Sequence, residues 1–98
     1  MNNIVINNTT VNIKPINFEA ICALEDLGFD VQTIGSKTFS SIRCSVAYHM
    51  DITVSEASKM IEEHIINGGK LADFLPFLEA ITKSDFFIAI TKGVQTVN

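Results

Sequence analysis

The sequence predicts a mainly α-helical protein in which an N-terminal β-hairpin precedes four or five packed amphipathic helices. Three observations predict this class: two β-branched runs near the N-terminus, apolar residues at helical spacing through most of the remaining chain, and capping residues before several helical segments. A chain of 98 residues is long enough for one domain and short for two, so we expect a single domain over residues 1–98.

Residues 3–14 carry the signal for the hairpin. Residues 3–7 and 10–14 alternate in pattern and flank an Asn-rich tip at Asn7 and Asn8. Asn tolerates the left-handed backbone that a tight hairpin turn requires. Pro15 has no N–H to donate to a sheet, so the second strand should end before it.

Capping residues and glycines mark where the helices begin and end. Asn17 is a good N-cap for the first helix, and Gly28 is a typical stop. Thr53 and Glu56 have the spacing of a capping box, which satisfies two backbone N–H groups at a helix start. The predicted helices span about 18–27, 38–50, 54–67, 70–82 and 85–91, with a connection over 28–37 and a frayed end over 93–98.

Pro76 interrupts the fourth predicted helix. Proline removes a backbone donor and crowds the preceding turn. Either the helix kinks there, or a short turn ends at Leu75 and a new helix starts with Pro76 in its first turn.

The composition is apolar and mildly acidic. Hydrophobic residues make up 47% and charged residues 18%, which argues against disorder and indicates either a tight core or self-association or a bound partner. The net charge of −4 and the lack of basic runs argue against nucleic acid or an anionic membrane as partners. We expect no signal peptide, no membrane span, and free thiols at Cys22 and Cys44 in a reducing cytoplasm.

The residues that usually carry catalysis are few. His49, His64, Cys22 and Cys44 have no spacing typical of a metal site, so we expect no enzyme activity, no metal and no cofactor. His64 lies on an apolar stripe, which favours a satisfied boundary histidine over a pH switch. The alternative at these residues is a cysteine-dependent enzyme. It predicts a thiolate of depressed pKa at Cys22 or Cys44.

Arg43 lies beside the apolar stripe of the second helix. It has two possible roles: binding a partner's carboxylate, or, as we prefer, pairing with Asp51 or with an acidic side chain of the third helix.

The order of these features resembles the tail assembly chaperones of long-tailed bacteriophages and prophages. That family has a short hairpin, then Asn-Phe and a helix of the type A-x-x-E-L-E-x-x-G; the matching residues here are Asn17, Phe18, Ala20, Leu24, Glu25, Leu27 and Gly28. A second family pattern, D-x-x-L-T-x-E-E-A-x-x-L-I, matches Asp51, Thr53, Glu56, Ala57, Met60 and Ile61. The resemblance covers roughly residues 4–82 as a layout, although Asn8 stands where the family usually has glycine and Thr10 replaces an aromatic residue.

The resemblance implies a chaperone that coats the tape measure protein and recruits tail tube subunits. It would act in the cytoplasm of the bacterial host and would not enter the mature virion. The alternative is an unrelated small helical interaction module, such as a regulatory adaptor or a toxin inhibitor.

Apolar residues are concentrated in the last two predicted helices. The run of residues 86–90 either forms a fifth core helix or lies exposed as an adhesive strip. Because a tape measure protein is a long helical chain with apolar faces, its chaperone should offer helix-sized grooves. The candidate partner-binding residues are Phe74, Leu78, Phe86 and Phe87.

Overall fold

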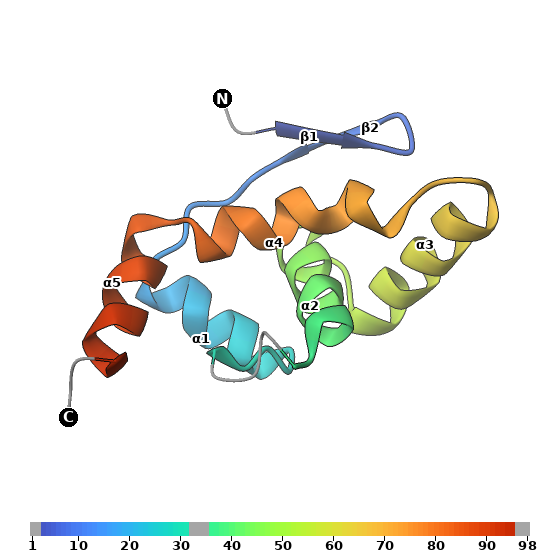
Figure 1. Cartoon of the computed structure of the whole chain (residues 1–98). Coiled ribbons are helices and arrows are strands. Elements are labelled where there is room, and N and C mark those ends of the chain that lie inside the picture. The colour runs from blue at the N-terminus through green and yellow to red at the C-terminus, as the bar shows by residue number, and fades with distance from the viewer. Residues whose placement is uncertain (1–2, 32–35, 96–98) are drawn as a thin grey trace.

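The computed structural model, which describes residues 3–31 and 36–95, confirms a mainly α-helical fold with an N-terminal hairpin (Figure 1). The described elements are β1 (Asn3–Ile6), β2 (Thr9–Asn12), α1 (Phe18–Asp26), α2 (Thr38–Met50), α3 (Val54–Ile66), the 3₁₀ turn η2 (Leu71–Phe74), α4 (Leu75–Thr82) and α5 (Asp85–Gln95). The predicted connection over 28–37 lies partly outside the described residues, and so does the predicted frayed end beyond residue 95.

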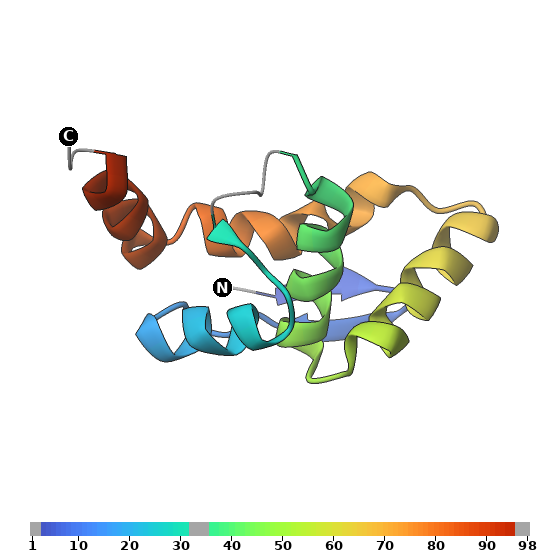
Figure 2. The same ribbon diagram turned by 90° about the horizontal axis from the view of Figure 1, so that it is seen from below.

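Helix α2 is at the centre of the molecule. It contacts α1, α3, α4 and β2. Figures 1 and 2 show α1 and α3 on opposite sides of α2, with α4 crossing it on the side where the hairpin lies. Helix α5 packs against α4 and lies at the opposite end of the molecule from α3 (Figure 1). Every other helix is therefore placed by packing on α2 or α4.

The core forms where these helices face one another. Its largest fully buried side chains are Phe74, Phe77, Leu24, Ile42, Ile81 and Val46. The antiparallel hairpin pairs Ile4 with Val11 and Ile6 with Thr9. This register turns Ile6 and Val11 into the core and leaves Val5, on the other face, 67% exposed.

The predicted caps are present. The Asn17 side chain accepts a hydrogen bond from the backbone of Ala20 at 2.9 Å. The backbone N–H of Thr53 donates to the Glu56 carboxylate, and the backbone N–H of Glu56 donates to the Thr53 hydroxyl. These bonds satisfy N–H groups that a helix start otherwise leaves unpaired, so the starts of α1 and α3 are fixed locally.

The structure shows how the chain accommodates Pro76 and where the last helix ends. A 3₁₀ turn precedes α4, and Pro76 lies in the first turn of α4, so the chain starts a new helix there and does not kink. The end of α5 was predicted too early, because the helix continues to Gln95. A single glycine inside a helical stretch is tolerated, so residue 93 does not end it.

The hairpin turn predicts a stabilising substitution. Asn7 and Asn8 both have positive φ angles, 52° and 62°, as in a two-residue type I′ turn. Because this turn favours glycine at its second position, Asn8→Gly should raise the free energy of unfolding by about 0.5 kcal/mol in a urea titration. Asn7→Gly is the matched control, and it should lower stability because it removes the hydrogen bond between Oδ1 of Asn7 and Nδ1 of His64. Equal effects of the two substitutions would contradict this explanation.

Candidate functional site

Of the side chains with catalytic potential, Cys44, His49 and His64 each make a hydrogen-bond contact with another residue. The Cys44 thiol is buried and donates a hydrogen bond to the Leu27 carbonyl at 3.4 Å, and burial raises its pKa. Cys44 is therefore held as a neutral thiol, which is a poor nucleophile. Cys22 is half-buried. Among the described residues, no group of three or more His, Cys, Asp or Glu side chains is placed to hold a metal ion.

His49 joins the hairpin to α2. It is 3% exposed, and its Nδ1 accepts a hydrogen bond from the backbone N–H of Lys14 at 3.2 Å. Nδ1 is an acceptor only in a neutral ring, so the proton of this ring lies on Nε2. Burial, aided by the Lys14 ammonium, lowers the pKa of His49 to about 4, although the backbone of Phe77 acts in the opposite direction. His49 is therefore a neutral core residue.

His64 joins three elements at the hairpin tip. Its Nδ1 lies 2.8 Å from Oδ1 of Asn7, and its Nε2 lies 2.8 Å from Oδ2 of Asp73 in η2. Two hydrogen bonds lower the pKa of the Asp73 carboxyl. The bond to His64 has the larger effect, and the bond from the backbone N–H of Lys70 has the smaller one. His64 thus lies at the boundary of the core with each ring nitrogen at hydrogen-bond distance from a side-chain oxygen, in keeping with its position on the apolar stripe.

Gly69 leaves the space that the His64 ring occupies. Gly68, with φ of 102°, ends α3, and the Gly69 N–H donates to the His64 carbonyl at 2.8 Å. A Cβ atom at residue 69 would lie 2.2 Å from Nε2 of His64. Any side chain at this position would therefore push the ring away from Asp73.

Gly69→Ala is expected to lower the free energy of unfolding by about 1–2 kcal/mol, as overpacking of a tight contact does. The measurement is chemical denaturation in a double-mutant cycle with His64→Ala. Because the clash is with the His64 ring, the alanine at residue 69 should have little effect once that ring is removed. An equal loss in both backgrounds would show that the clash with His64 is not the cause.

The four residues predicted to bind a partner do not form a surface. Phe74 has no exposed area, and Leu78 and Phe87 are each 7% exposed. Phe86 is half-buried, and its ring lies edge-on to Phe18 with centroids 6.4 Å apart. These four side chains therefore belong to the core or its margin, which corrects the surface groove expected at them, whereas Ile88 of α5 is 47% exposed.

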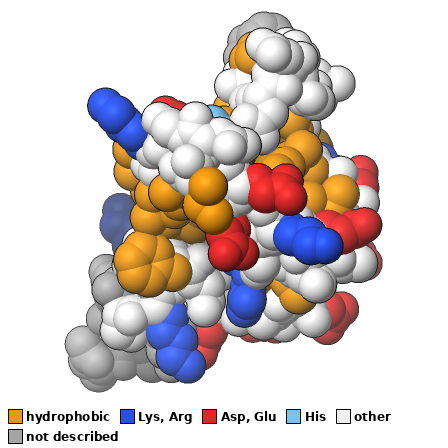
Figure 3. All heavy atoms as spheres, turned by 90° about the vertical axis from the view of Figure 1, so that its right-hand side faces the viewer, with side chains coloured by type: hydrophobic (Ala, Val, Ile, Leu, Met, Phe, Trp, Pro, Cys, Tyr) orange, Lys and Arg blue, Asp and Glu red, His pale blue; other side chains and the backbone are white. Residues whose placement is uncertain are grey.

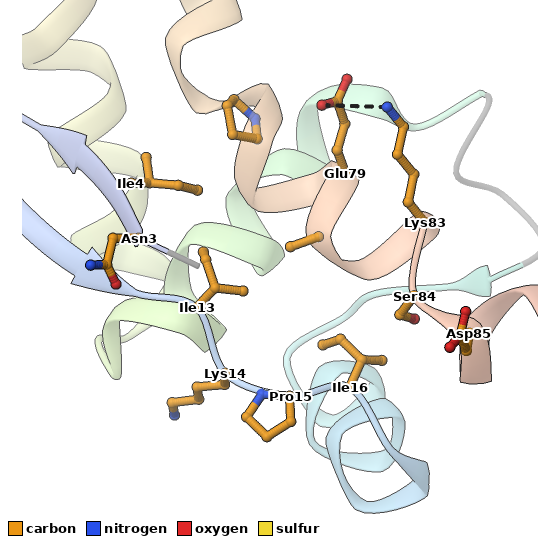
Figure 4. Close-up of a pocket in the computed structure, with 12 residues that line it drawn as sticks. Asn3, Ile4, Ile13, Lys14, Pro15, Ile16, Glu79, Lys83, Ser84 and Asp85 are labelled. Atoms are coloured by element: carbon orange, nitrogen blue, oxygen red, sulfur yellow. Dashed lines mark ion pairs between the residues drawn. The ribbon is translucent and has the colours of Figure 1, made fainter. Parts of the chain in front are cut away.

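A hollow of about 680 Å³ lies between α4 and the segment that follows the hairpin (Figure 4). Ile13 and Ile16 line one side of it, and Glu79 and Lys83 line the other (Figure 4). These two charged side chains pair with each other at 3.8 Å. The hollow thus has an apolar side and a charge-paired side, and Asp85, which also lines it, forms no ion pair with the described residues.

A second groove, of about 320 Å³, runs between α2 and α3. Apolar side chains from three elements line most of it: Phe39 and Ile42 of α2, Ile61 and Ile65 of α3, and Leu71 of η2. Phe39 is 74% exposed and Ile65 is 41% exposed. Figure 3, which views the molecule from the side of α3, shows hydrophobic side chains at the left and again at the right of this face, with acidic and basic ones between them.

Arg43 lines this groove and forms no ion pair with any residue that the structure describes. Its Nε atom is buried and makes no hydrogen bond, and no carboxylate of the described residues lies within ion-pair distance of it. The predicted pairing with Asp51 is wrong, because Asp51 pairs with Lys14. The Lys14 ammonium also lies 4.8 Å from the centre of the Tyr48 ring. Arg43 therefore remains a positive charge beside an apolar surface.

A membrane span requires a helix that is both long and strongly apolar, and no helix in the described part of the chain is both. Comparisons of the chain with protein-family models, with curated proteins and with solved structures found no match.

Proposed function

We propose that this chain is a non-enzymatic tail assembly chaperone of a long-tailed bacteriophage or prophage. It binds the tape measure protein in the cytoplasm of the host, recruits tail tube subunits, and is absent from the mature virion. The proposal starts from the resemblance in residues 4–82, and the order of hairpin and helices is compatible with it.

The observation that carries the proposal is the apolar groove between α2 and α3. A chaperone of a long helical chain has to cover apolar helix faces and release them again, which requires an exposed apolar surface of limited size. Phe39 and Ile65 supply such a surface at the edge of a groove of about 320 Å³. Grooves of this size are at the lower end of ligand-binding cavities and suit side chains from one helix face.

Co-expression tests this function directly. The tagged chain is produced together with the tape measure and tail tube proteins of the same genome, and soluble complexes are purified and identified. The tape measure protein should be soluble and co-purify with the chain, but sediment when expressed alone. A tagged acidic protein of similar size and unrelated sequence is the control for nonspecific capture.

Recovery of neither tail protein from a folded sample would overturn the proposal. Tight binding to a toxin or regulator under those conditions would favour the alternative of an unrelated adaptor.

A further inference from the structure

We infer that the groove between α2 and α3 binds an amphipathic helix that places a carboxylate against Arg43. The inference rests on the proposed function only in naming the tape measure protein as the source of that helix. It assigns the binding surface to residues on α2, α3 and η2, away from the buried C-terminal residues that the sequence suggested.

The apolar part of the groove fits one face of a helix. Ile61 and Ile65 are one helical turn apart on α3 and face Phe39 and Ile42 of α2 across the groove. Phe39 and Ile65 lie exposed at its edge. A partner helix with apolar residues three and four positions apart would cover these side chains and gain stability from their burial.

Arg43 specifies the charge of the partner. A guanidinium group is always protonated near neutral pH and offers several N–H donors in a planar fork that matches a carboxylate. Here Nε is buried without an acceptor, and no acidic side chain of the described residues neutralises the group. A carboxylate on the partner would supply the missing negative charge in a partly apolar setting, where such a pair is stronger than in water.

Glu62 gives the partner helix an orientation. It lies on the α3 wall of the groove, whereas Arg43 lies on the α2 wall. A carboxylate would be attracted to the α2 wall and repelled by the α3 wall, so the acidic edge of the partner helix should face α2. A basic residue on the other edge of that helix would face Glu62. With the apolar face of the helix held in the groove, this arrangement selects one of the two directions in which the helix can lie along it.

The test measures the affinity of the full-length chain for the tape measure protein by titration calorimetry. Two changes address the groove: Arg43→Glu, and Phe39→Ser combined with Ile65→Ser. Val5→Ser is the matched control, because Val5 is a similarly exposed apolar residue on the hairpin and does not line the groove. Thermal unfolding of each variant checks that its fold is retained.

Each groove variant should weaken binding by about tenfold or more, and Val5→Ser by less than about twofold. Arg43→Lys should fall between Arg43→Glu and the unchanged chain, because it keeps the charge and loses the fork. If Arg43→Glu reduces the stability of the fold, Arg43→Gln replaces it in the test. A loss of about tenfold in affinity for the tape measure protein is still expected.

Three results would overturn the inference, and they differ in whether they also overturn the proposed function. Unchanged affinity of both groove variants would place binding elsewhere and leave the proposed function intact. Loss of binding in the Phe39 and Ile65 variant alone would refute the role of the carboxylate. Failure of the unchanged chain to bind the tape measure protein would overturn the proposed function and this inference together.

Discussion

Replacement of Phe77 by alanine is expected to lower the free energy of unfolding by about 3–5 kcal/mol, the usual loss for truncating a buried aromatic side chain. Phe77 has no exposed surface, and its ring stacks on that of Phe74 with centroids 6.4 Å apart. The His49 ring lies on it as well, with the two ring centroids 6.0 Å apart. Since small domains are stable by only about 5–15 kcal/mol, urea should unfold this variant at a much lower concentration.

Phe39→Ala is the matched control for this prediction. It removes the same atoms from a side chain that is 74% exposed. Its effect on the free energy of unfolding should stay within about 0.5 kcal/mol. Equal losses at the two positions would mean that the core does not lie between α2 and α4 as described.

Stability should fall as the pH is lowered from about 6.5 to about 4, because of His49. Its pKa is lowered from 6.5 to about 4 in the folded chain, so over this range the unfolded chain binds a proton that the folded chain does not. Proton binding to the unfolded state favours unfolding. The stability contributed by the neutral ring is thus complete above pH 6.5 and lost by about pH 4. At about 1.4 kcal/mol per pKa unit, the loss is about 3 kcal/mol.

The measurement compares the free energy of unfolding of the unchanged chain and of His49→Gln across this pH range. Glutamine can still accept the hydrogen bond from the Lys14 backbone, but it does not titrate. The variant should lose less stability than the unchanged chain by about 3 kcal/mol between the two pH limits. Asp73, whose pKa is lowered from 3.8, contributes only at lower pH and is present in both proteins. Parallel pH profiles of the two proteins would contradict a buried neutral His49.

The sequence predicts features that depend on neighbouring residues. The side chain of Asn17 caps α1, and Thr53 and Glu56 cap α3, because each cap needs partners only three positions away. The hairpin turn is likewise local, because it needs only two adjacent residues, Asn7 and Asn8, that tolerate positive φ angles. These elements form where the residue pattern places them.

Contacts between distant segments are not predicted in this way. The backbone N–H of Lys14 donates a hydrogen bond to His49, which is 35 residues away. The Lys14 side chain forms an ion pair with Asp51, which was expected to pair with Arg43. Nothing near His49 in the sequence indicates its burial, since the hairpin covers it only after folding.

Apolar content also does not distinguish core from binding surface. Phe74 and Phe87 share their residue type with Phe39, yet the first two are buried and Phe39 is exposed. Which aromatic residues remain at the surface depends on how α4 and α5 pack. The groove between α2 and α3 therefore emerges only from the packed structure.

The central claim is that this groove holds a helix of the tape measure protein, and photo-crosslinking tests it most directly. A photoreactive phenylalanine derivative replaces Ser40, which lines the groove, or Val5, which does not. After co-expression and illumination, crosslinked peptides are identified by mass spectrometry. We expect crosslinks from residue 40 to tape measure segments with helically spaced apolar residues and an adjacent Asp or Glu, and none from residue 5. Co-purification of the tape measure protein with crosslinks from residue 5 alone would contradict the claim.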